Sequence, residues 1–275
     1  MNNNRDFSNT ICLIDADGTL FNSLVRYNGA IDRMFLGKYT DRNYIEYYSE
    51  FNNAYDIIPG SPWKLIFDLM VQFLGYDKPT EEDLNAIVAQ FEDYSIEEFK
   101  KLTYDDFAIK PIFEFCKKYV KDGGKIVIHS GTNRRILEQM LTSADVWDLF
   151  SGYLCTDMLE CDASKLGKWG YKAKLLELVK ERYNTSGRKA FVLGDTKGDG
   201  FGAAEHNLPF VMSWRGYPKN PYELSGELRG EATVLRPDIV VDMRQERIDA
   251  YGENPEITAA INNDLITILD WCSSL

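Results

Sequence analysis

Histidine is scarce in this sequence of 275 residues, which contains only two, His129 and His206. A zinc site built on several histidines and a Ser-His-Asp triad both need imidazoles, so this chain has little material for either. Acidic residues are plentiful by comparison, because the 43 aspartates and glutamates exceed the 31 lysines and arginines. We therefore expect carboxylates to supply the chemistry of any catalytic site.

Long apolar runs are also missing. No segment approaches the roughly 18–20 apolar residues that a helix needs to cross a bilayer, and the polar residues 1–6 lack the pattern of a secretion signal. The five cysteines form an odd set without CxxC spacing, which fits reduced thiols in a cytoplasmic protein. The net charge of −12 argues against an extended nucleic-acid face, because phosphate backbones require clustered lysine and arginine. We expect a cytoplasmic protein with neither nucleic-acid nor membrane partners.

Short apolar runs that end abruptly in polar residues recur along the chain. Runs of this length are typical of strands buried on both faces, and helix-like segments separate them. The runs are Ile11–Ile14 before Asp15, Ile126–Ile128 before His129 and Ser130, Phe191–Leu193 before Gly194 and Asp195, and Phe210–Met212 before Ser213 and Trp214. The helix-like segments are 108–121, 133–142, 169–183 and 198–206. This alternation predicts an α/β fold with a doubly wound parallel sheet, a Rossmann-like core whose ligands bind beyond the carboxyl ends of the strands.

The stretch 21–106 lacks such a buried strand and carries helix-period patterns instead, for example at Trp63–Leu74. Glu81–Asp83 place acidic residues where the first turn of another helix is expected, which favours the helix dipole. We therefore expect an all-helical cap domain at 21–106. It would be inserted after the first strand of an α/β catalytic core formed by 1–20 and 107–275.

The segment Asp15–Leu20 (DADGTL) directly follows the first predicted strand. On its own it is as typical of a strand-to-helix turn as of a catalytic site, because Asp and Gly are common in turns. A calcium loop does not fit, since a strand rather than a helix precedes it and Arg26 stands where the bidentate glutamate belongs. The ends of two further strands favour a site, because His129–Thr132 and Gly194–Asp199 add hydroxyl groups and two carboxylates.

Together these segments resemble the motifs of the haloacid dehalogenase-like hydrolases, a superfamily dominated by phosphatases. The order matches, with Asp-x-Asp-Gly-Thr-Leu at Asp15–Leu20, a strand-ending Ser130, a later lysine, and Gly-Asp-x-x-x-Asp at Gly194–Asp199. Asn22-Ser23 and Trp214–Tyr217 resemble the phosphoglycolate phosphatase-type branch. The resemblance covers roughly 8–22 and 107–245, and it implies a helical cap between the first two motifs.

The resemblance implies a magnesium-dependent phosphatase that passes through an aspartyl-phosphate. Asp15 would be the nucleophile, and Asp17 would act as general acid and base. The ligands of Mg²⁺ would come from Asp15, Asp17 and Asp195, an oxygen set that suits this ion, with Asp199 orienting the groups around them. The groups that would hold the phosphate are Thr19, Ser130, Gly131 and Lys168.

Three lysines are candidates for the lysine that holds the phosphate: Lys165, Lys168 and Lys172. The position of Lys168 relative to the following predicted helix favours it, although the Lys-Pro-x-Pro sequence frequent in relatives is replaced here by Lys-Trp-Gly-Tyr. His129 should point to the other side of its strand from Ser130, so we expect it to be a packed core residue rather than a catalyst.

The predicted function is hydrolysis of a small phosphomonoester metabolite with Mg²⁺ as cofactor. A sugar-phosphate mutase of the same superfamily is an alternative, because it uses the same pair of aspartates. A non-catalytic metabolite-binding protein on this fold is a second alternative. No pattern in the sequence identifies the substrate or the oligomeric state.

Overall fold

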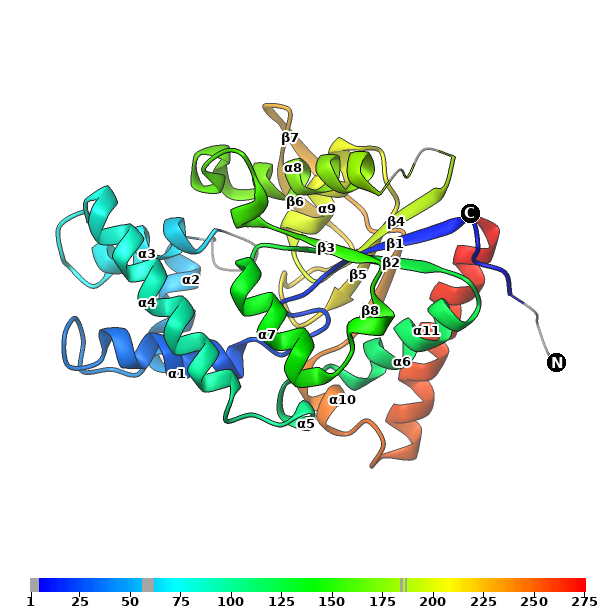
Figure 1. Cartoon of the computed structure of the whole chain (residues 1–275), viewed down its shortest axis with the longest axis horizontal. Helices are drawn as coiled ribbons and strands as arrows, with labels where there is room; N and C mark the ends of the chain where they lie inside the picture. The colour runs from blue at the N-terminus through cyan, green and yellow to red at the C-terminus, as the bar shows by residue number, and fades with distance from the viewer. Residues whose placement is uncertain (1–4, 56–61, 184, 186) are drawn as a thin grey trace.

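The structure is a computed structural model that describes residues 5–55, 62–183, 185 and 187–275, without the side chains of 24–26, 164, 167 and 168. At its centre is a sheet of six parallel strands in the order β3-β2-β1-β4-β5-β8 (Figure 1). The strands are β1 (Thr10–Asp15), β2 (Lys125–Ser130), β3 (Gly152–Cys155), β4 (Lys189–Gly194), β5 (Phe210–Trp214) and β8 (Ile239–Asp242). The predicted α/β fold with a doubly wound parallel sheet is confirmed.

Strand β1 shows why the apolar runs of the sequence become central strands. All of its residues are buried. Ile11 and Leu13 belong to one cluster of buried side chains, whereas Cys12 and Ile14 belong to a second cluster. Since successive side chains point to opposite faces and helices cover both, each position in such a strand needs an apolar residue.

Different helices cover the two faces of the sheet (Figure 1). One face carries α6 (Lys110–Lys121), α7 (Arg134–Ala144) and α11 (Pro255–Ser274). The other carries α8 (Gly167–Arg182), α9 (Lys197–Glu205) and the hairpin of β6 (Leu224–Leu228) and β7 (Glu231–Leu235). The shorter helices are α10 (Gln245–Asp249) and the 3-10 turns Trp147–Leu149, Thr156–Met158 and Ala163–Leu166. The helix-like segments of the sequence correspond to α6–α9, whereas β3, β8, the hairpin and α11 were not anticipated.

The strand order reverses between β1 and β4. From β1 the chain adds β2 and β3 on one side, and it then returns to place β4 on the other side of β1. In open α/β sheets a crevice forms at such a reversal, beyond the carboxyl ends of the strands. Asp15 ends β1, and Asp195 directly follows β4. The pairing of Ile14 with Leu193 brings both carboxylates to the same sheet edge.

Between β1 and α6 the described residues form five helices: α1 (Leu24–Phe35), α2 (Tyr44–Tyr55), α3 (Trp63–Phe73), α4 (Glu81–Phe99) and the short α5 (Tyr104–Phe107). We call α1–α4 the helical insertion. It lies beyond the sheet edge at which β1 ends (Figure 1). Buried aromatic side chains build much of its interior, among them Tyr47, Phe51, Phe67 and Phe91. The helix start expected at 81–83 is present, and Thr80 and Asp83 close it with a capping box.

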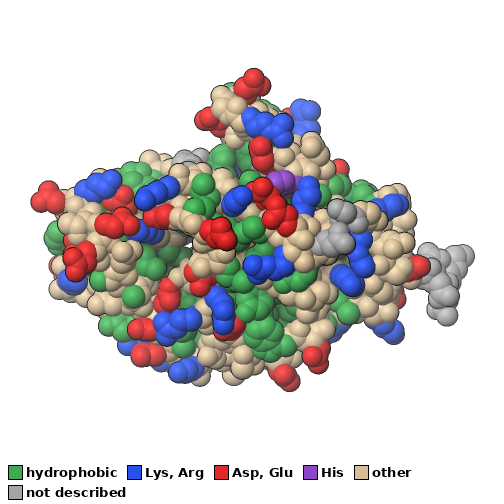
Figure 2. All heavy atoms as spheres, turned by 45° about the horizontal axis from the view of Figure 1, so that its top comes forward, with side chains coloured by type: hydrophobic (Ala, Val, Ile, Leu, Met, Phe, Trp, Pro, Cys, Tyr) green, Lys and Arg blue, Asp and Glu red, His purple; other side chains and the backbone are tan. Residues whose placement is uncertain are grey.

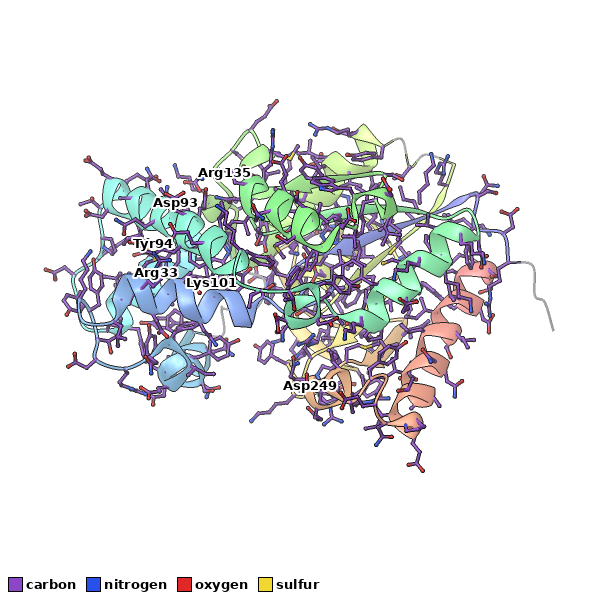
Figure 3. All side chains as sticks on the ribbon, turned by 60° about the horizontal axis from the view of Figure 1, so that its bottom comes forward. Arg33, Asp93, Tyr94, Lys101, Arg135 and Asp249 are labelled. Carbon is purple, nitrogen blue, oxygen red and sulfur yellow. The ribbon has the colours of Figure 1, made fainter. Side chains whose placement is uncertain are left out.

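Ion pairs connect the helical insertion to the α/β core. Arg135 of α7 contacts two acidic residues of α4, with its Nη2 3.0 Å from Asp93 Oδ1 and its Nη1 3.6 Å from Glu92 Oε2. Figure 3 shows Arg135 and Asp93 side by side between the two helices. Lys64 of α3 reaches Asp162 of the core at 3.4 Å. Because ion pairs that are wholly or partly exposed contribute little free energy, we attribute to them the placement of the insertion rather than the stability of the fold.

None of the described helices is long and apolar enough to cross a bilayer. On the face shown in Figure 2, lysine and arginine side chains are interspersed with aspartates and glutamates. The described side chains on that face form no extended basic patch of the kind that a phosphate backbone requires.

Candidate active site

The loop that follows β1 is held by its own backbone. The amides of Leu20 and Phe21 donate to the carbonyl of Ala16 at 2.9 and 3.0 Å, and the amide of Gly18 donates to the carbonyl of Phe21 at 2.8 Å. Gly18 has a φ of +82°, in the left-handed region that favours glycine. This compact turn leaves Asp17 beside Asp15 at the wall of a cleft between the sheet edge and the insertion.

Asp195 lies directly against this loop. The Thr19 hydroxyl donates to Asp195 Oδ1 at 3.1 Å. A Cβ atom on Gly18 would lie only 2.1 Å from Asp195 Oδ2, which is well inside the closest approach of two such atoms. Gly18 is therefore needed both for the turn and for the close approach of the second carboxylate.

Gly18→Ala is expected to destabilise the protein more than Gly75→Ala does. Gly75 also has a positive φ, +87°, but a Cβ there would meet nothing within 4 Å. Both variants acquire the strain of a left-handed alanine, about 1–2 kcal/mol. Gly18→Ala must in addition displace Asp195, which adds about 1–3 kcal/mol. Urea unfolding of both variants would measure the difference, and equal losses of unfolding free energy would contradict the close approach.

Lys172 of α8 is buried between two carboxylates. Its Nζ lies 2.6 Å from Asp15 Oδ1 and 2.8 Å from Asp199 Oδ1, and the residue is 1% exposed. Burial opposes the charge of the ammonium group, but Asp15 and Asp199 outweigh that effect and hold the pKa of Lys172 well above its ordinary value. Lys172 is therefore a fixed positive charge against Asp15.

Asp199 is positioned by the first turn of α9. The amide and hydroxyl of Thr196 donate to Asp199 Oδ2 at 3.1 and 2.6 Å, and the Asp199 amide donates to Thr196 Oγ1 at 3.3 Å. This capping box leaves Asp199 Oδ1 facing Lys172. Burial opposes the charge of Asp199, yet Lys172 outweighs it, so the pKa of Asp199 lies below its ordinary value. Asp199 thus aligns the lysine.

Asp17 is held by hydroxyl groups from two segments of the chain. The Ser23 hydroxyl donates to its Oδ1, and the Thr132 hydroxyl donates to its Oδ2. Ser23 precedes α1 at the start of the insertion, whereas Thr132 follows β2 in the core. The Asp17 carboxylate therefore has a fixed direction at the junction of the two parts.

The end of β2 provides small groups on the opposite side of the cleft from Asp195. Ser130 is fully buried, and its hydroxyl accepts the amide of Thr132 at 3.0 Å. Gly131 lines the cleft, and a Cβ there would lie 2.7 Å from the hydroxyl oxygen of Tyr171. His129 is fully buried, and burial together with the charge of Lys172 lowers its pKa to about 3. It is a neutral core residue 3.9 Å from Asp199, as the strand alternation led us to expect.

The carboxylates fit a divalent cation. The pKa of Asp15 lies well above its ordinary value. Burial is the main cause, Lys172 opposes it, and repulsion from Asp199 and Asp195 adds to it. Burial and Asp199 likewise raise the pKa of Asp195 to about 7. A hard cation with oxygen ligands between Asp15 and Asp195 would relieve this repulsion. Oxygen and nitrogen atoms of Asp15, His129 and Asp199 also lie within 4.8 Å of one another, but Lys172 already bridges those two carboxylates.

Neither a scan against protein-family models nor a search of curated proteins found a match to this sequence. Similar solved structures do exist. β-Phosphoglucomutase from Clostridium difficile is 13% identical, with a TM-score of 0.63 over 94% of this chain and 99% of that one. CbbY from Rhodobacter sphaeroides, in complex with phosphate, is 16% identical, with a TM-score of 0.60 over 86% and 94%. The HAD hydrolase YfnB from Bacillus subtilis, bound to magnesium, is 13% identical, with a TM-score of 0.56 over 88% and 97%.

The chain has the haloacid dehalogenase-like fold. The resemblance that the sequence motifs indicated is thus confirmed at the level of the fold. Within this haloacid dehalogenase-like fold, the motif carboxylates Asp15, Asp17 and Asp195 and the backbone of Gly131 line one cleft. Thr19 and Ser130 are fully buried beside it, and the Thr19 hydroxyl faces Asp195 rather than an open position for phosphate.

Among the three candidate lysines, the structure places Lys172 against Asp15. Lys172 contacts Asp15, Lys165 is exposed on its 3-10 turn, and the side chain of Lys168 is outside the described residues. In the sequence the three lysines are spaced by three and four residues, a spacing that predicts one shared face if they lie on one continuous helix. Lys172 lies more than one turn inside α8, where the helix packs on the sheet, whereas the assignment of Lys168 stays a prediction.

The cleft has a volume of about 430 Å³. Several of its lining residues had no assigned role in the sequence: Tyr27, Tyr44 and Trp63 of the insertion, and Arg215 and Gln245 of the core. Aromatic residues recur throughout 21–106, so the sequence has no signal that separates those facing the cleft from those in the interior of the insertion. The position of Arg215 is easier to infer from the sequence, because Arg215 directly follows β5 and so lies at the same sheet edge as Asp15.

Proposed function

We propose that this protein is a Mg²⁺-dependent phosphatase that hydrolyses a small phosphomonoester through an aspartyl-phosphate on Asp15. The observation that carries this proposal is the placement of Asp15 at a switch-point strand end, with the Lys172 ammonium 2.6 Å from its Oδ1. A buried nucleophile, a fixed cation and a second aspartate two residues on are the groups that phosphoryl transfer requires.

In the first step a carboxylate oxygen of Asp15 attacks the phosphorus atom, and the bond from phosphorus to the leaving alcohol breaks. Asp17, oriented by Ser23 and Thr132, gives a proton to that alcohol. In the second step water attacks the phosphorus, Asp17 takes a proton from it, and the aspartyl-phosphate bond breaks to release inorganic phosphate. The enzyme returns to its starting protonation state.

The remaining groups stabilise the charge on the transferring phosphoryl group. Lys172, held by Asp199, neutralises negative charge on Asp15 and on the phosphoryl oxygens. The Ser130 hydroxyl and the backbone at Gly131 offer further donors on the β2 side. The ligands of Mg²⁺ would be Asp15, Asp195 and the Asp17 carbonyl. The ion would lower the repulsion between the nucleophile and the anionic substrate.

We propose that residues 21–106 form a cap domain over a catalytic core of 1–20 and 107–275. The cleft walls support this division, because α1, α2 and α3 provide one side and the strand ends provide the other. A cap in this position excludes water during phosphoryl transfer and admits small phosphorylated metabolites rather than phosphoproteins.

Release of inorganic phosphate tests the proposed function. The purified protein with Mg²⁺ would be incubated with a panel of phosphorylated metabolites, and both phosphate and isomerised products would be measured. Stoichiometric phosphate release supports the phosphatase, and conversion of a sugar phosphate to its isomer without phosphate release would assign a mutase instead. No product of either kind with any substrate would favour a non-catalytic binding protein.

Removal of the metal is expected to abolish activity. EDTA should eliminate phosphate release, and added Mg²⁺ should restore it. Asp195→Asn should raise the Mg²⁺ concentration for half-maximal activity at least about 10-fold, because one ligand charge is lost. Calorimetric titration with Mg²⁺ provides a second readout that does not depend on turnover. Asp148→Asn, at an exposed position in the core, is the matched control. Full activity in EDTA would contradict the assignment.

A further inference from the structure

The wall that the helical insertion contributes to the cleft is aromatic. Tyr27 of α1, Tyr44 and Tyr48 of α2, and Trp63 and Ile66 of α3 all line it. Their rings hold one another in place: the centroids of Tyr27 and Trp63 lie 4.4 Å apart at 70°, and those of Tyr44 and Tyr48 lie 5.5 Å apart at 76°. These edge-to-face contacts fix the orientation of the rings, so that each ring offers a face or an edge in a set direction along the cleft.

Ordered neighbours behind the wall keep these rings in position. Trp63 packs on Phe91 of α4 with ring centroids 4.2 Å apart. The wall also reaches the catalytic end of the cleft, since burial and the charge of Asp195 raise the pKa of the Tyr48 phenol to about 12. A ligand with its phosphate at Asp15 would therefore have its body against these rings.

The opposite side of the cleft has polar side chains, and one nitrogen atom of Arg215 lacks a hydrogen-bond partner among the described residues. Gln245 Oε1 accepts from Asn22 at 3.1 Å and from Arg215 Nη2 at 2.7 Å. Arg215 Nη1 is buried and has no hydrogen-bond partner among the described residues. A buried guanidinium N–H without an acceptor is unfavourable, so a bound ligand that brings an acceptor to this point would be favoured.

The size of the cleft and the chemistry of its walls limit the body of the substrate. A volume of about 430 Å³ lies in the range of sites that enclose drug-sized ligands, and it exceeds the needs of a two- or three-carbon phosphate. Hydroxyl groups of a substrate would find partners at Asn22, Asn28 and Gln245, but not against Ile66 and the ring face of Trp63. A flat ring would pack against one of the aromatic faces, and an acceptor at its edge would meet Arg215.

We propose that the substrate is a phosphate monoester of an alcohol that carries a flat heteroaromatic ring, with the ring against Tyr48 and Trp63 and an acceptor on its edge facing Arg215. This inference rests on the proposed phosphatase function and adds the class of the leaving group. The phosphate and the ring would lie next to each other in one cleft.

Matched substrates test the role of the ring. Nucleoside 5′-monophosphates and methyl ribofuranoside 5-phosphate share the reacting phosphate and the sugar, and they differ in the base. The full chain with Mg²⁺ is expected to show a kcat/KM for the best base-bearing compound about 10- to 100-fold above that for the methyl riboside, as stacking on aromatic side chains implies. Equal or faster turnover of the methyl riboside would overturn the inference and leave the phosphatase function intact.

Variants of the aromatic wall test the same point from the side of the protein. In Trp63→Leu, and independently in Tyr48→Leu, the ratio of the two kcat/KM values should fall at least about 5-fold, because a stacking surface is lost. Trp147→Leu is the matched control, since Trp147 is an exposed aromatic of the core outside the cleft lining. An unchanged ratio in folded Trp63→Leu and Tyr48→Leu would contradict the proposal.

Binding of the dephosphorylated nucleosides separates the two proposals. Quenching of tryptophan fluorescence by a nucleoside, absent in Trp63→Phe, supports a ring site even if no phosphate is released. Phosphate release without such quenching, and without preference for the base, supports the phosphatase alone. Absence of both phosphate release and quenching would overturn both proposals.

Discussion

Asp15→Asn is expected to lower kcat by at least about 10⁴-fold, the scale seen when a catalytic nucleophile is removed. The amide of asparagine is a poor nucleophile and does not form the acyl-phosphate bond. The fold should persist, because the amide has nearly the shape of the carboxylate and carries no charge into a site that is 3% exposed. Single-turnover phosphate release measures the loss, and circular dichroism checks the fold.

The matched control for this variant is Asp270→Asn. Asp270 is an exposed aspartate of α11 whose carboxylate pairs with Arg5, and it does not line the cleft. The control should retain the activity of the original protein. Near-normal activity in Asp15→Asn would remove Asp15 from the role of nucleophile, and loss of folding in both variants would show that the substitution acts through stability instead.

Lys172→Met is expected to damage both activity and stability. The ammonium group lies between Asp15 and Asp199, and its loss leaves those two buried carboxylates without their shared cation. Removal of one partner from a buried ion pair costs about 3–5 kcal/mol of unfolding free energy. Loss of charge stabilisation at the phosphoryl group should lower kcat by about 10²–10³-fold. Urea unfolding and steady-state kinetics measure the two effects separately.

Lys165→Met and Lys168→Met serve as controls for Lys172→Met. Lys165 is exposed, so its replacement should leave both kcat and stability nearly unchanged. Lys168 is the lysine that the sequence favoured, and its replacement tests that prediction directly. A large loss of kcat in Lys168→Met with little change in Lys172→Met would return the catalytic role to Lys168.

The lysine also shows where the sequence stops being informative. Leu175, Leu176 and Val179 continue the buried face of α8 at three, four and seven residues after Lys172. The same spacing extends backward from Lys172 to Lys168 and Lys165, so periodicity alone gives all three the same direction. The burial of each lysine distinguishes the three. That burial depends on where α8 begins and on which of its turns packs against the sheet.

The unanticipated elements have a similar explanation. Strand β8 borders β5 at the edge of the sheet, and three of its four residues are only half-buried. Hairpin strands β6 and β7 alternate between exposed and partly buried residues outside the main sheet. Such strands lack the continuous apolar run that marks a central strand, because only one side of each is covered.

The sequence by itself determined the class of the fold and the carboxylates of the site. Four buried strands carry continuous apolar runs because helices cover both faces of the sheet. Asp15 at the end of β1 and Asp195 after β4 are polar because a switch-point crevice opens there. These are consequences of local pattern and of strand order, both of which can be inferred from a single sequence.

Only the tertiary structure decided which lysine reaches Asp15, that Gly18 must be a glycine to admit Asp195, and which aromatic residues of the insertion face the cleft. Each of these facts is a contact between segments far apart in the chain. Lys172 and Asp15 are separated by 157 residues. Local periodicity fixes the direction of a side chain relative to its own helix or strand, whereas the partner of that side chain depends on how the elements pack.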